Sequence, residues 1–340
     1  MPILGRIKVI MIDLSNHFIH GRTTFDGVLH IYNTASGVEF NACTSFLSIA
    51  MKTIAKQKDE AWVKAIIDDD YDNAIDIKVD SSSREFIVLN CDNREVHNFK
   101  ILKASEAIES YVDISEISIS GEFLDKPKYD KMFLVYGDST VSGYGNLGKV
   151  NDSKTLFDTD GLNGYAFLSS KHFHATLNSV NGSGWGLVFS PWTTPMRRPL
   201  LNLFDKVAPL SDLSFDIKSI KPTIALISLG TNDSFYIASS EDGKKDDLVN
   251  EFKASYKKLI GLIKDSFGDI PIVMVYGVMR ERHNYQVMHD IYLENKEKIN
   301  LYEALIEGDG QGVSGHPSIG SHKEISKKLI ELLKVILGEC

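Results

Sequence analysis

Two motifs far apart in the chain hold a serine and a histidine whose side chains suit ester hydrolysis. The first, VYGDSTVSGYG at residues 135–145, places Ser139 in a turn directly after a nearly continuous apolar run. The second, GVSGHPSIGSHKE at residues 312–324, places His316 in a loop before an expected final helix. A serine hydroxyl becomes a nucleophile when a neighbouring base accepts its proton. Because the pKa of imidazole lies near neutrality, His316 could accept that proton and later return it.

Two further motifs could supply hydrogen-bond donors to the negative oxygen of a tetrahedral intermediate. SLGTNDS at residues 228–234 contains Asn232, whose side-chain amide is a neutral donor of the kind found in oxyanion holes. NGSGWG at residues 181–186 contains glycines that let the backbone approach a ligand closely. The N–H groups of Gly184 and Ser139 are therefore candidate donors beside Asn232. Each motif alone is equally typical of a turn or, for Asn232, of a helix N-cap.

Residues 131–340 have the pattern of an α/β fold with a parallel sheet flanked by helices. Apolar runs typical of strands buried on both faces alternate with amphipathic helical patterns. The expected strands are 132–137, 184–190, 223–230, 271–277 and 299–305, and the expected helices are 162–177, 246–267, 284–297 and 319–337. Reactive loops in such sheets gather beyond the carboxyl ends of the strands. The motifs that contain Ser139, Asn232 and His316 lie at or after the ends of expected strands, so we expect them to meet at that edge.

Residues 1–125 have a different pattern, with short strands, turn clusters such as NCDNRE and no helical period. The expected strands are 8–14, 28–34, 61–68, 74–79, 85–90, 97–104 and 115–124. Repeated short strands of this kind predict a β-sandwich of jelly-roll type. The polar segment 124–130 contains a proline and is the expected connector. We therefore predict a sandwich domain at 1–125 and a catalytic domain at 131–340.

Composition and charge exclude several classes of partner. At 340 residues the chain is long enough for two domains, and its net charge of −9 argues against a surface that binds nucleic acid or an anionic membrane. It contains no run of 18 or more apolar residues, so we expect no transmembrane helix. The N-terminus lacks the pattern of a signal peptide. We expect a cytoplasmic location, or a secreted one if a leader has been removed.

The sequence predicts neither a metal site nor an organic cofactor. Cys43, Cys91 and Cys340 are scattered and form no CxxC pair. His172 and His174 form an HFH pair, but the pattern suggests no third ligand, so we expect no zinc site. Fingerprints for phosphate or dinucleotide binding are also missing. Any chemistry is therefore expected to come from the side chains and the backbone.

The order of the motifs resembles that of the SGNH (GDSL-like) hydrolase superfamily: GDS, a glycine block, GTND and a C-terminal HP. The resemblance covers residues 131–340 and implies a three-layer fold with a parallel sheet. It implies that Ser139 is the nucleophile and His316 the general base. It also implies that the N–H groups of Ser139 and Gly184 and the amide of Asn232 hold the oxyanion.

The β-rich region before these motifs is similar to the N-terminal sandwich of carbohydrate esterase family 2. The similarity rests on GRTTFDGVLHIYNTASGVEF at 21–40 and ILKASEA at 101–107. Members of that family remove acetyl groups from the sugar hydroxyls of polysaccharides such as xylan. The resemblance therefore implies a serine esterase like the acetyl xylan esterases, with an acetylated carbohydrate as its partner and no cofactor.

Two tryptophans near the motifs are candidates for contact with a sugar. Trp185 follows Gly184, and Trp192 lies in the SPWTTP segment. Flat apolar rings suit the faces of pyranose rings, although tryptophans beneath loops commonly pack in the core. We interpret Arg197 and Arg198 as residues that anchor their loop through salt bridges.

The chain departs from the superfamily pattern at the residue that should orient the histidine. Most SGNH enzymes carry an aspartate three residues before it, and here that position is Val313, followed by Ser314. In a serine protease, loss of the triad acid lowers kcat by about four orders of magnitude. A backbone carbonyl could accept the histidine N–H, as in the Ser-His dyads of some family 2 members, or Asp309 could fold back. The first explanation is favoured.

Three functions remain open at this point. Carbohydrate deacetylation through an acyl-enzyme on Ser139 is the leading hypothesis. A sugar O-acetyltransferase would use the same site if a sugar hydroxyl replaced water as the acceptor. A catalytically inactive carbohydrate-binding protein on an esterase scaffold is the third, and the missing aspartate is its only support.

Overall fold

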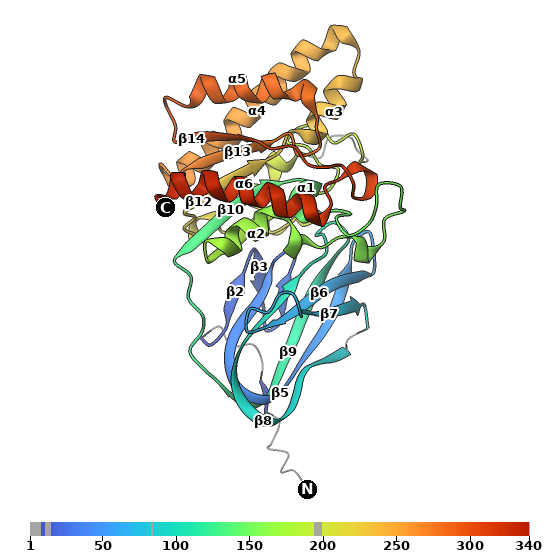
Figure 1. The fold of residues 1–340 in the computed structure, drawn as a ribbon, viewed down its shortest axis with the longest axis vertical. Coiled ribbons are helices and arrows are strands. Elements are labelled where there is room, and N and C mark those ends of the chain that lie inside the picture. Colours follow the sequence, from blue (N-terminus) through green and yellow to red (C-terminus); the bar gives the residue numbers. More distant parts are fainter. Residues whose placement is uncertain (1–7, 11–14, 83, 194–198, 340) are drawn as a thin grey trace. The chain divides into compact units, whose positions relative to one another are not determined.

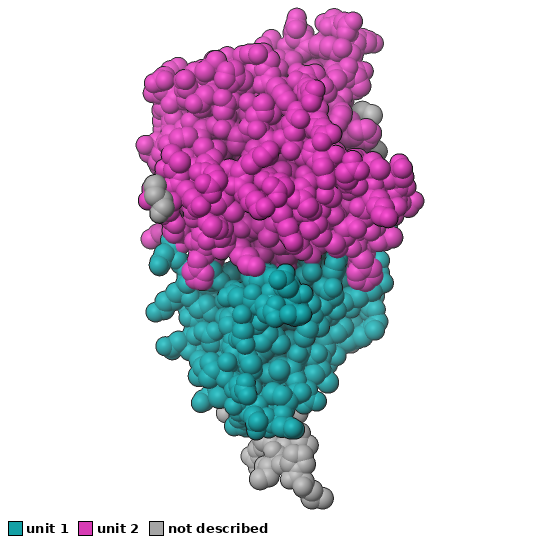
Figure 2. Space-filling view, viewed as in Figure 1, with its two compact units in different colours: residues 1–130 teal, residues 131–340 magenta. Residues whose placement is uncertain are grey.

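The computed structural model describes residues 8–10, 15–82, 84–193 and 199–339. The chain divides into two compact units, Met1–Asp130 (unit 1) and Lys131–Cys340 (unit 2). Figure 2 colours the two units separately. The segment 124–130 forms the end of unit 1, and the first strand of unit 2 begins directly after it.

The described part of unit 1 forms a nine-stranded sheet whose pairs are all antiparallel. Its strands are β1 (Lys8–Ile10), β2 (Phe18–His20), β3 (Thr23–Phe25), β4 (Leu29–Ile31), β5 (Gly37–Ala55), β6 (Glu60–Ile67), β7 (Ile75–Asp80), β8 (Arg84–Lys103) and β9 (Ser110–Phe123). The order is β3-β4-β9-β5-β8-β6-β7, while β1 pairs with β9 and β2 with β5. The expectation of an all-β first region is confirmed.

Three long strands dominate unit 1, and the sequence analysis foresaw only β9, which it expected at 115–124. It missed β5, which has 19 residues, and it split β8, which has 20 residues, into 85–90 and 97–104. The cluster NCDNRE was expected to be a turn, but Asn90 and Glu95 pair with β5 within one continuous strand. The pairing of β5 with β8 shifts register between Thr44 and Phe46, where bulges increase the local bend of a strand. Of the expected strand 8–14, residues 11–14 lie outside the described part.

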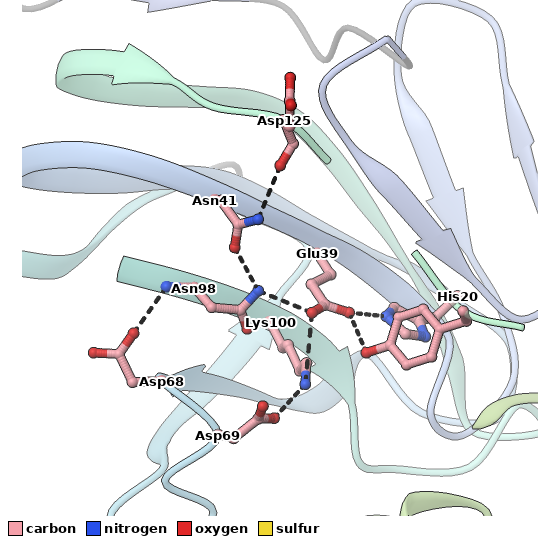
Figure 3. Close-up of polar contacts among 9 residues, drawn as sticks. His20, Glu39, Asn41, Asp68, Asp69, Asn98, Lys100 and Asp125 are labelled. Atoms are coloured by element: carbon pink, nitrogen blue, oxygen red, sulfur yellow. Dashed lines mark hydrogen bonds and ion pairs between the residues drawn. The ribbon is translucent and has the colours of Figure 1, made fainter. Parts of the chain in front are cut away.

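A buried carboxylate network ties strands of unit 1 together (Figure 3). Glu39 on β5 is 2% exposed and accepts hydrogen bonds from His20 Nε2 at 2.7 Å, Tyr129 Oη at 2.7 Å and Asn98 Nδ2 at 2.9 Å. Lys100 Nζ lies 3.5 Å from the same carboxylate. Burial acts to raise the pKa of Glu39, but the hydrogen bond and charge of His20 and the charge of Lys100 outweigh it. The resulting pKa is about 2.

Unit 2 is built on a five-stranded parallel sheet with the order β11-β10-β12-β13-β14. The strands are β10 (Lys131–Gly137), β11 (Ala175–Asn181), β12 (Ile224–Ser228), β13 (Ile272–Tyr276) and β14 (Leu301–Leu305). Every residue of β11, β12 and β13 is buried, as expected for a sheet covered on both faces. The predicted α/β fold with a parallel sheet is confirmed.

Helices cover both faces of this sheet (Figure 1). The α-helices are α1 (Ser139–Ser142), α2 (Tyr165–His172), α3 (Thr231–Ser239), α4 (Asp242–Phe267), α5 (Tyr285–Asn295) and α6 (Ile319–Leu337). Short 3-10 helices lie at Leu156–Asp158, Gly161–Asn163, Leu200–Leu203, Ile217–Ser219, Arg282–Asn284 and Val313–Gly315. Helices α2 and α6 pack together on one face, and α4 and α5 cover the other. Among the described helices, none combines the length and apolar character needed to cross a membrane.

Two predicted elements of unit 2 are wrong. The expected strand 184–190 is a loop, and the strand beside β10 is Ala175–Asn181. Because β11 begins at Ala175, the expected helix 162–177 is too long. Helix α2 ends at His172, and His174 adopts a φ of +49°, which is outside the α-helical region. The run ATLNSVN is rich in polar residues, so it lacks the apolar continuity by which the other strands were recognised.

Candidate active site

Ser139 follows the carboxyl end of β10, which lies between β11 and β12 in the sheet, and is the first residue of α1. Asp138 caps this helix by accepting the N–H of Thr140 at 2.9 Å, and burial raises the pKa of Asp138 to about 7. The turn is tight because the Val141 side chain fills the space next to Gly137, where an added Cβ would lie 2.2 Å from a Val141 methyl. Strand, cap and glycine together fix the direction in which Ser139 leaves the sheet.

The structure brings Ser139 and His316 together, although 177 positions separate them. His316 Nε2 lies 2.8 Å from Ser139 Oγ, and His316 Nδ1 lies 2.9 Å from the carbonyl oxygen of Val313. A carbonyl can only accept a hydrogen bond, so Nδ1 carries the proton of the neutral imidazole. The lone pair of Nε2 is then free to accept the hydrogen of the Ser139 hydroxyl. This is the arrangement that a serine nucleophile and its base require.

The electrostatics keep His316 neutral. Burial lowers its pKa, the hydrogen bond to Val313 acts to raise it, and the charge of Lys154 lowers it further, to a value of about 4. At neutral pH the imidazole is therefore unprotonated and can act as a base.

The loop that holds His316 is fastened to the loop that follows the nucleophile. The N–H of Val313 donates to Gly145 O at 2.9 Å, and the N–H of Gly312 donates to His316 O at 2.7 Å. Gly145 has a φ of +64°, and a Cβ added there would lie 2.6 Å from Val313 Cβ. Only glycine allows this close approach, so the loops that hold Ser139 and His316 are joined by backbone contacts.

Asp309 does not orient the histidine, which corrects the second explanation of the sequence analysis. Its carboxylate accepts the N–H groups of Ser318 at 2.9 Å and Gln311 at 3.1 Å, and the Ser318 hydroxyl. Ser318 is the N-cap of α6. Asp309 thus supports the start of that helix, where a negative charge is favourable. The partner of His316 Nδ1 is Val313 O, as the favoured explanation expected.

Gly184 lies in the loop after β11, and Asn232 lies at the start of α3, which follows β12, so the two residues come after the strands on either side of β10. Gly137 at the end of β10 is in register with Asn181 of β11 and Ser228 of β12. Asn232 is 4% exposed in the first turn of α3, and its Nδ2 donates one hydrogen to Trp185 O at 3.0 Å. The second hydrogen of this amide remains for another acceptor. Gly184 has a φ of +77°, which turns the backbone of its loop in the left-handed region.

Asp233 is a site residue that the sequence analysis missed. Its carboxylate is fully buried and accepts the N–H groups of Leu187, Val188 and Phe189 at 2.7 to 2.8 Å. Burial raises the pKa of Asp233 to about 6, against the three hydrogen bonds, which lower it. Asp233 thereby shapes the loop that contains Gly184. The available signal was its place directly after Asn232 in GTND.

The two tryptophans differ in their environments. Trp185 is 6% exposed and belongs to the core beside Leu187 and Phe189, which corrects the prediction that its ring contacts a sugar. Trp192 is 70% exposed, and its ring centroid lies 6.3 Å from that of Phe235. Trp192 therefore stays a candidate. The predicted loop anchors Arg197 and Arg198 lie outside the described residues.

Tyr144 also escaped the sequence analysis, although it lies in the first motif. Its ring centroid is 4.5 Å from that of His316, so it covers the imidazole from one side.

In the part of the chain that the structure describes, no three His, Cys, Asp or Glu side chains gather as a metal site would require.

The chain as a whole is similar to known esterases. No family model matches the chain. It is 25% identical over 319 residues to the cellulase/esterase CelE of Acetivibrio thermocellus, covering 90% of the chain and 37% of that protein. It is 29% identical over 226 residues to an acetylxylan esterase / glucomannan deacetylase of Cellvibrio japonicus, covering 63% of the chain and 62% of that protein. The chain thus spans between about a third and two thirds of the length of these relatives.

Solved structures match the chain over nearly its whole length. One is a family two carbohydrate esterase from Clostridium thermocellum in complex with cellohexaose, with a TM-score of 0.81 and 23% identity over 95% of this chain and all of that one. Another is the acetyl xylan esterase Est2A from Butyrivibrio proteoclasticus, with a TM-score of 0.86 and 19% identity over 98% of this chain and 99% of that one. At these identities the likeness is one of fold.

Proposed function

Since the chain has the fold of the family 2 carbohydrate esterases, we propose that it is a serine esterase that removes acetyl groups from a carbohydrate. One observation carries this proposal: the 2.8 Å contact between Ser139 Oγ and His316 Nε2, with Nδ1 bound to Val313 O. That contact supplies a nucleophile and a base in the correct tautomer. The esterase names of both relatives support the same reaction.

In the proposed reaction Ser139 attacks the acetyl carbonyl while His316 takes its proton at Nε2. We propose that three donors stabilise the negative oxygen of the tetrahedral intermediate. They are the N–H groups of Ser139 and Gly184 and the second hydrogen of Asn232 Nδ2. His316 then returns the proton to the sugar oxygen, and the C–O bond of the ester breaks. Water attacks the acetyl-serine in the same way, which releases acetate and restores the hydroxyl of Ser139.

The carbonyl of Val313 takes over part of the role of a triad aspartate. It fixes the tautomer and direction of His316, and its dipole favours the imidazolium that forms during each step. It carries only a partial charge, so it stabilises that cation less than a carboxylate would. Burial and Lys154 oppose the cation further, which is consistent with the lowered pKa of His316.

The proposed substrate is an acetylated oligosaccharide or polysaccharide. One relative is named for acetylxylan and glucomannan, and one of the similar structures holds cellohexaose. Trp192 supports a sugar site because its indole is exposed, and exposed indoles stack on apolar sugar faces.

For unit 1 we propose a jelly-roll type of β-sandwich. The support is the antiparallel pairing and the long strands β5, β8 and β9, which line one shared apolar core.

The test is acetate release from acetylated xylan and glucomannan oligosaccharides, beside hydrolysis of p-nitrophenyl acetate. Wild type should release acetate, and Ser139→Ala should lower kcat at least about a thousandfold without loss of fold. Supplying an acetyl donor with unacetylated sugar separates a transferase, because the transferase accumulates acetyl-sugar in place of acetate. Wild type that hydrolyses neither ester faster than Ser139→Ala would refute the esterase.

A further inference from the structure

Tyr144 touches both halves of the catalytic pair. Its ring lies against the imidazole of His316, with centroids 4.5 Å apart and planes inclined by 38°. Its backbone N–H donates to Ser139 O at 3.1 Å. One residue thus connects the end of the nucleophile helix to the face of the base.

The hydrogen bonds of His316 leave one rotation of its ring weakly restrained. Both bonds, to Val313 O and to Ser139 Oγ, lie at ring nitrogens. Small rotations of the imidazole about its Cβ–Cγ bond change the lengths of both contacts little but move Nε2 out of the direction of Ser139 Oγ. A side chain against the ring face resists that rotation, and Tyr144 is so placed.

The groups around His316 point to a second role for Tyr144, which is to stabilise the protonated imidazole. Among the described residues, its partners are Ser139, Val313, Tyr144 and, through charge alone, Lys154 and the buried His322, and none of them is a carboxylate. The imidazolium that forms in each step therefore has no carboxylate among these partners. The face of an aromatic ring is negative and attracts a cation.

We propose that Tyr144 is a positioning residue for the base, and that its ring supplies the orientation and part of the cation stabilisation that a triad carboxylate would give. The inference rests on the proposed function and names a further residue of the same site. Lys154 Nζ lies 4.8 Å from the centroid of the Tyr144 ring and helps to hold the ring in place. The ring, and not its hydroxyl, is the active part.

The first experiment compares Tyr144→Phe with Tyr144→Leu on p-nitrophenyl acetate, which has no sugar. Phe keeps the ring, so kcat should fall less than about threefold. Leu keeps apolar bulk but loses the aromatic face, so kcat should fall about tenfold while KM changes little. Tyr292→Leu is the matched control: that ring lies 6.1 Å from His289 and 5.4 Å from Lys296, on α5 away from the site, and its loss should leave kcat unchanged.

A second experiment separates ring electrostatics from packing. Phenylalanines with increasing ring fluorination at position 144 keep the shape but progressively remove the negative face. The rate should fall stepwise with fluorination. Full activity of Tyr144→Leu, an equal loss in Tyr144→Phe, a change in KM alone or a flat fluorination series would each overturn the proposal.

The same variants are also scored by the rate at which a fluorophosphonate labels Ser139. That reaction needs the base but no acetyl or sugar site. If wild type hydrolyses no ester, the proposed function fails, but the labelling rates still decide the role of Tyr144. Slower labelling of Tyr144→Leu than of Tyr144→Phe supports that role, and equal labelling rates refute it. Melting temperatures confirm that each variant is folded.

Discussion

His316 Nδ1 lies 2.9 Å from the carbonyl oxygen of Val313, the residue three positions before it. The same residue donates its own N–H to Gly145 O, in the loop that follows the nucleophile helix. Val313 therefore fixes the base through one backbone group and the nucleophile loop through the other. A site built in this way needs no carboxylate for its geometry, but it forgoes a full negative charge beside the imidazole.

The pH dependence of kcat/KM should reflect the lowered pKa of His316. Only the neutral imidazole can accept the proton of Ser139. Because its pKa is about 4, the imidazole stays neutral at every pH well above 4. Activity should therefore rise with a midpoint near pH 4 and reach a plateau well below neutrality. An acid limb centred near 6.5, the ordinary value for histidine, would contradict the burial described here.

Removal of the charge of Lys154 should move that limb. Lys154 lowers the pKa of His316, so Lys154→Met should raise it and shift the midpoint of kcat/KM to higher pH. Lys245→Met is a suitable control, because that lysine is paired with Asp242 on α4, away from the site. A profile that stays in place, or moves to lower pH, counts against the charge effect.

Asn232→Ala should lower kcat by about a hundred- to a thousandfold if the amide holds the oxyanion. KM should change little, because the extra bond forms mainly in the transition state. The same amide donates to Trp185 O, so the melting temperature must be measured beside kcat. A loss of stability with kcat retained would make Asn232 a purely structural residue.

Asp309→Ala should reduce stability and spare catalysis. The substitution removes the acceptor for the Ser318 N–H at the start of α6, which should lower the free energy of unfolding by about 1–3 kcal/mol. Because Asp309 does not contact His316, kcat should stay within a few fold of wild type. Denaturant unfolding and ester hydrolysis check the two parts, and a drop in kcat of several orders of magnitude would restore Asp309 as the orienting acid.

Glu39→Gln should destabilise unit 1 in a way that depends on pH. A fall in pKa from 4.5 to about 2 corresponds to about 3 kcal/mol of stability. Since the folded pKa is depressed, this contribution is present above pH 4.5 and disappears as the pH falls through 2. Unfolding by urea at pH 7 should show the full difference from wild type, and the difference should shrink between pH 4.5 and 2. A constant gap over that range would exclude the ionised network as its cause.

The sequence by itself determined which side chains are candidates for the proposed site and the type of sheet that presents them. Ser139 follows the buried run 132–137, Asn232 follows 223–230 and His316 precedes a clear amphipathic helix. Apolar continuity and glycine-rich turns are local properties, so they can be recognised without knowledge of the fold. Long strands such as β5, with mixed polar and apolar residues, lack that local signal, and their pairing is decided by distant partners.

Only the tertiary structure decided which group orients the histidine. A backbone carbonyl exists at every position, so no residue type announces Val313 as the acceptor, whereas Asp309 is visible as a carboxylate and yet binds Ser318. The burial of Trp185 and the contact of Tyr144 with His316 are equally hidden in the sequence. Such roles depend on how the loops of unit 2 fold and pack against one another, and these contacts exist only once that unit has packed.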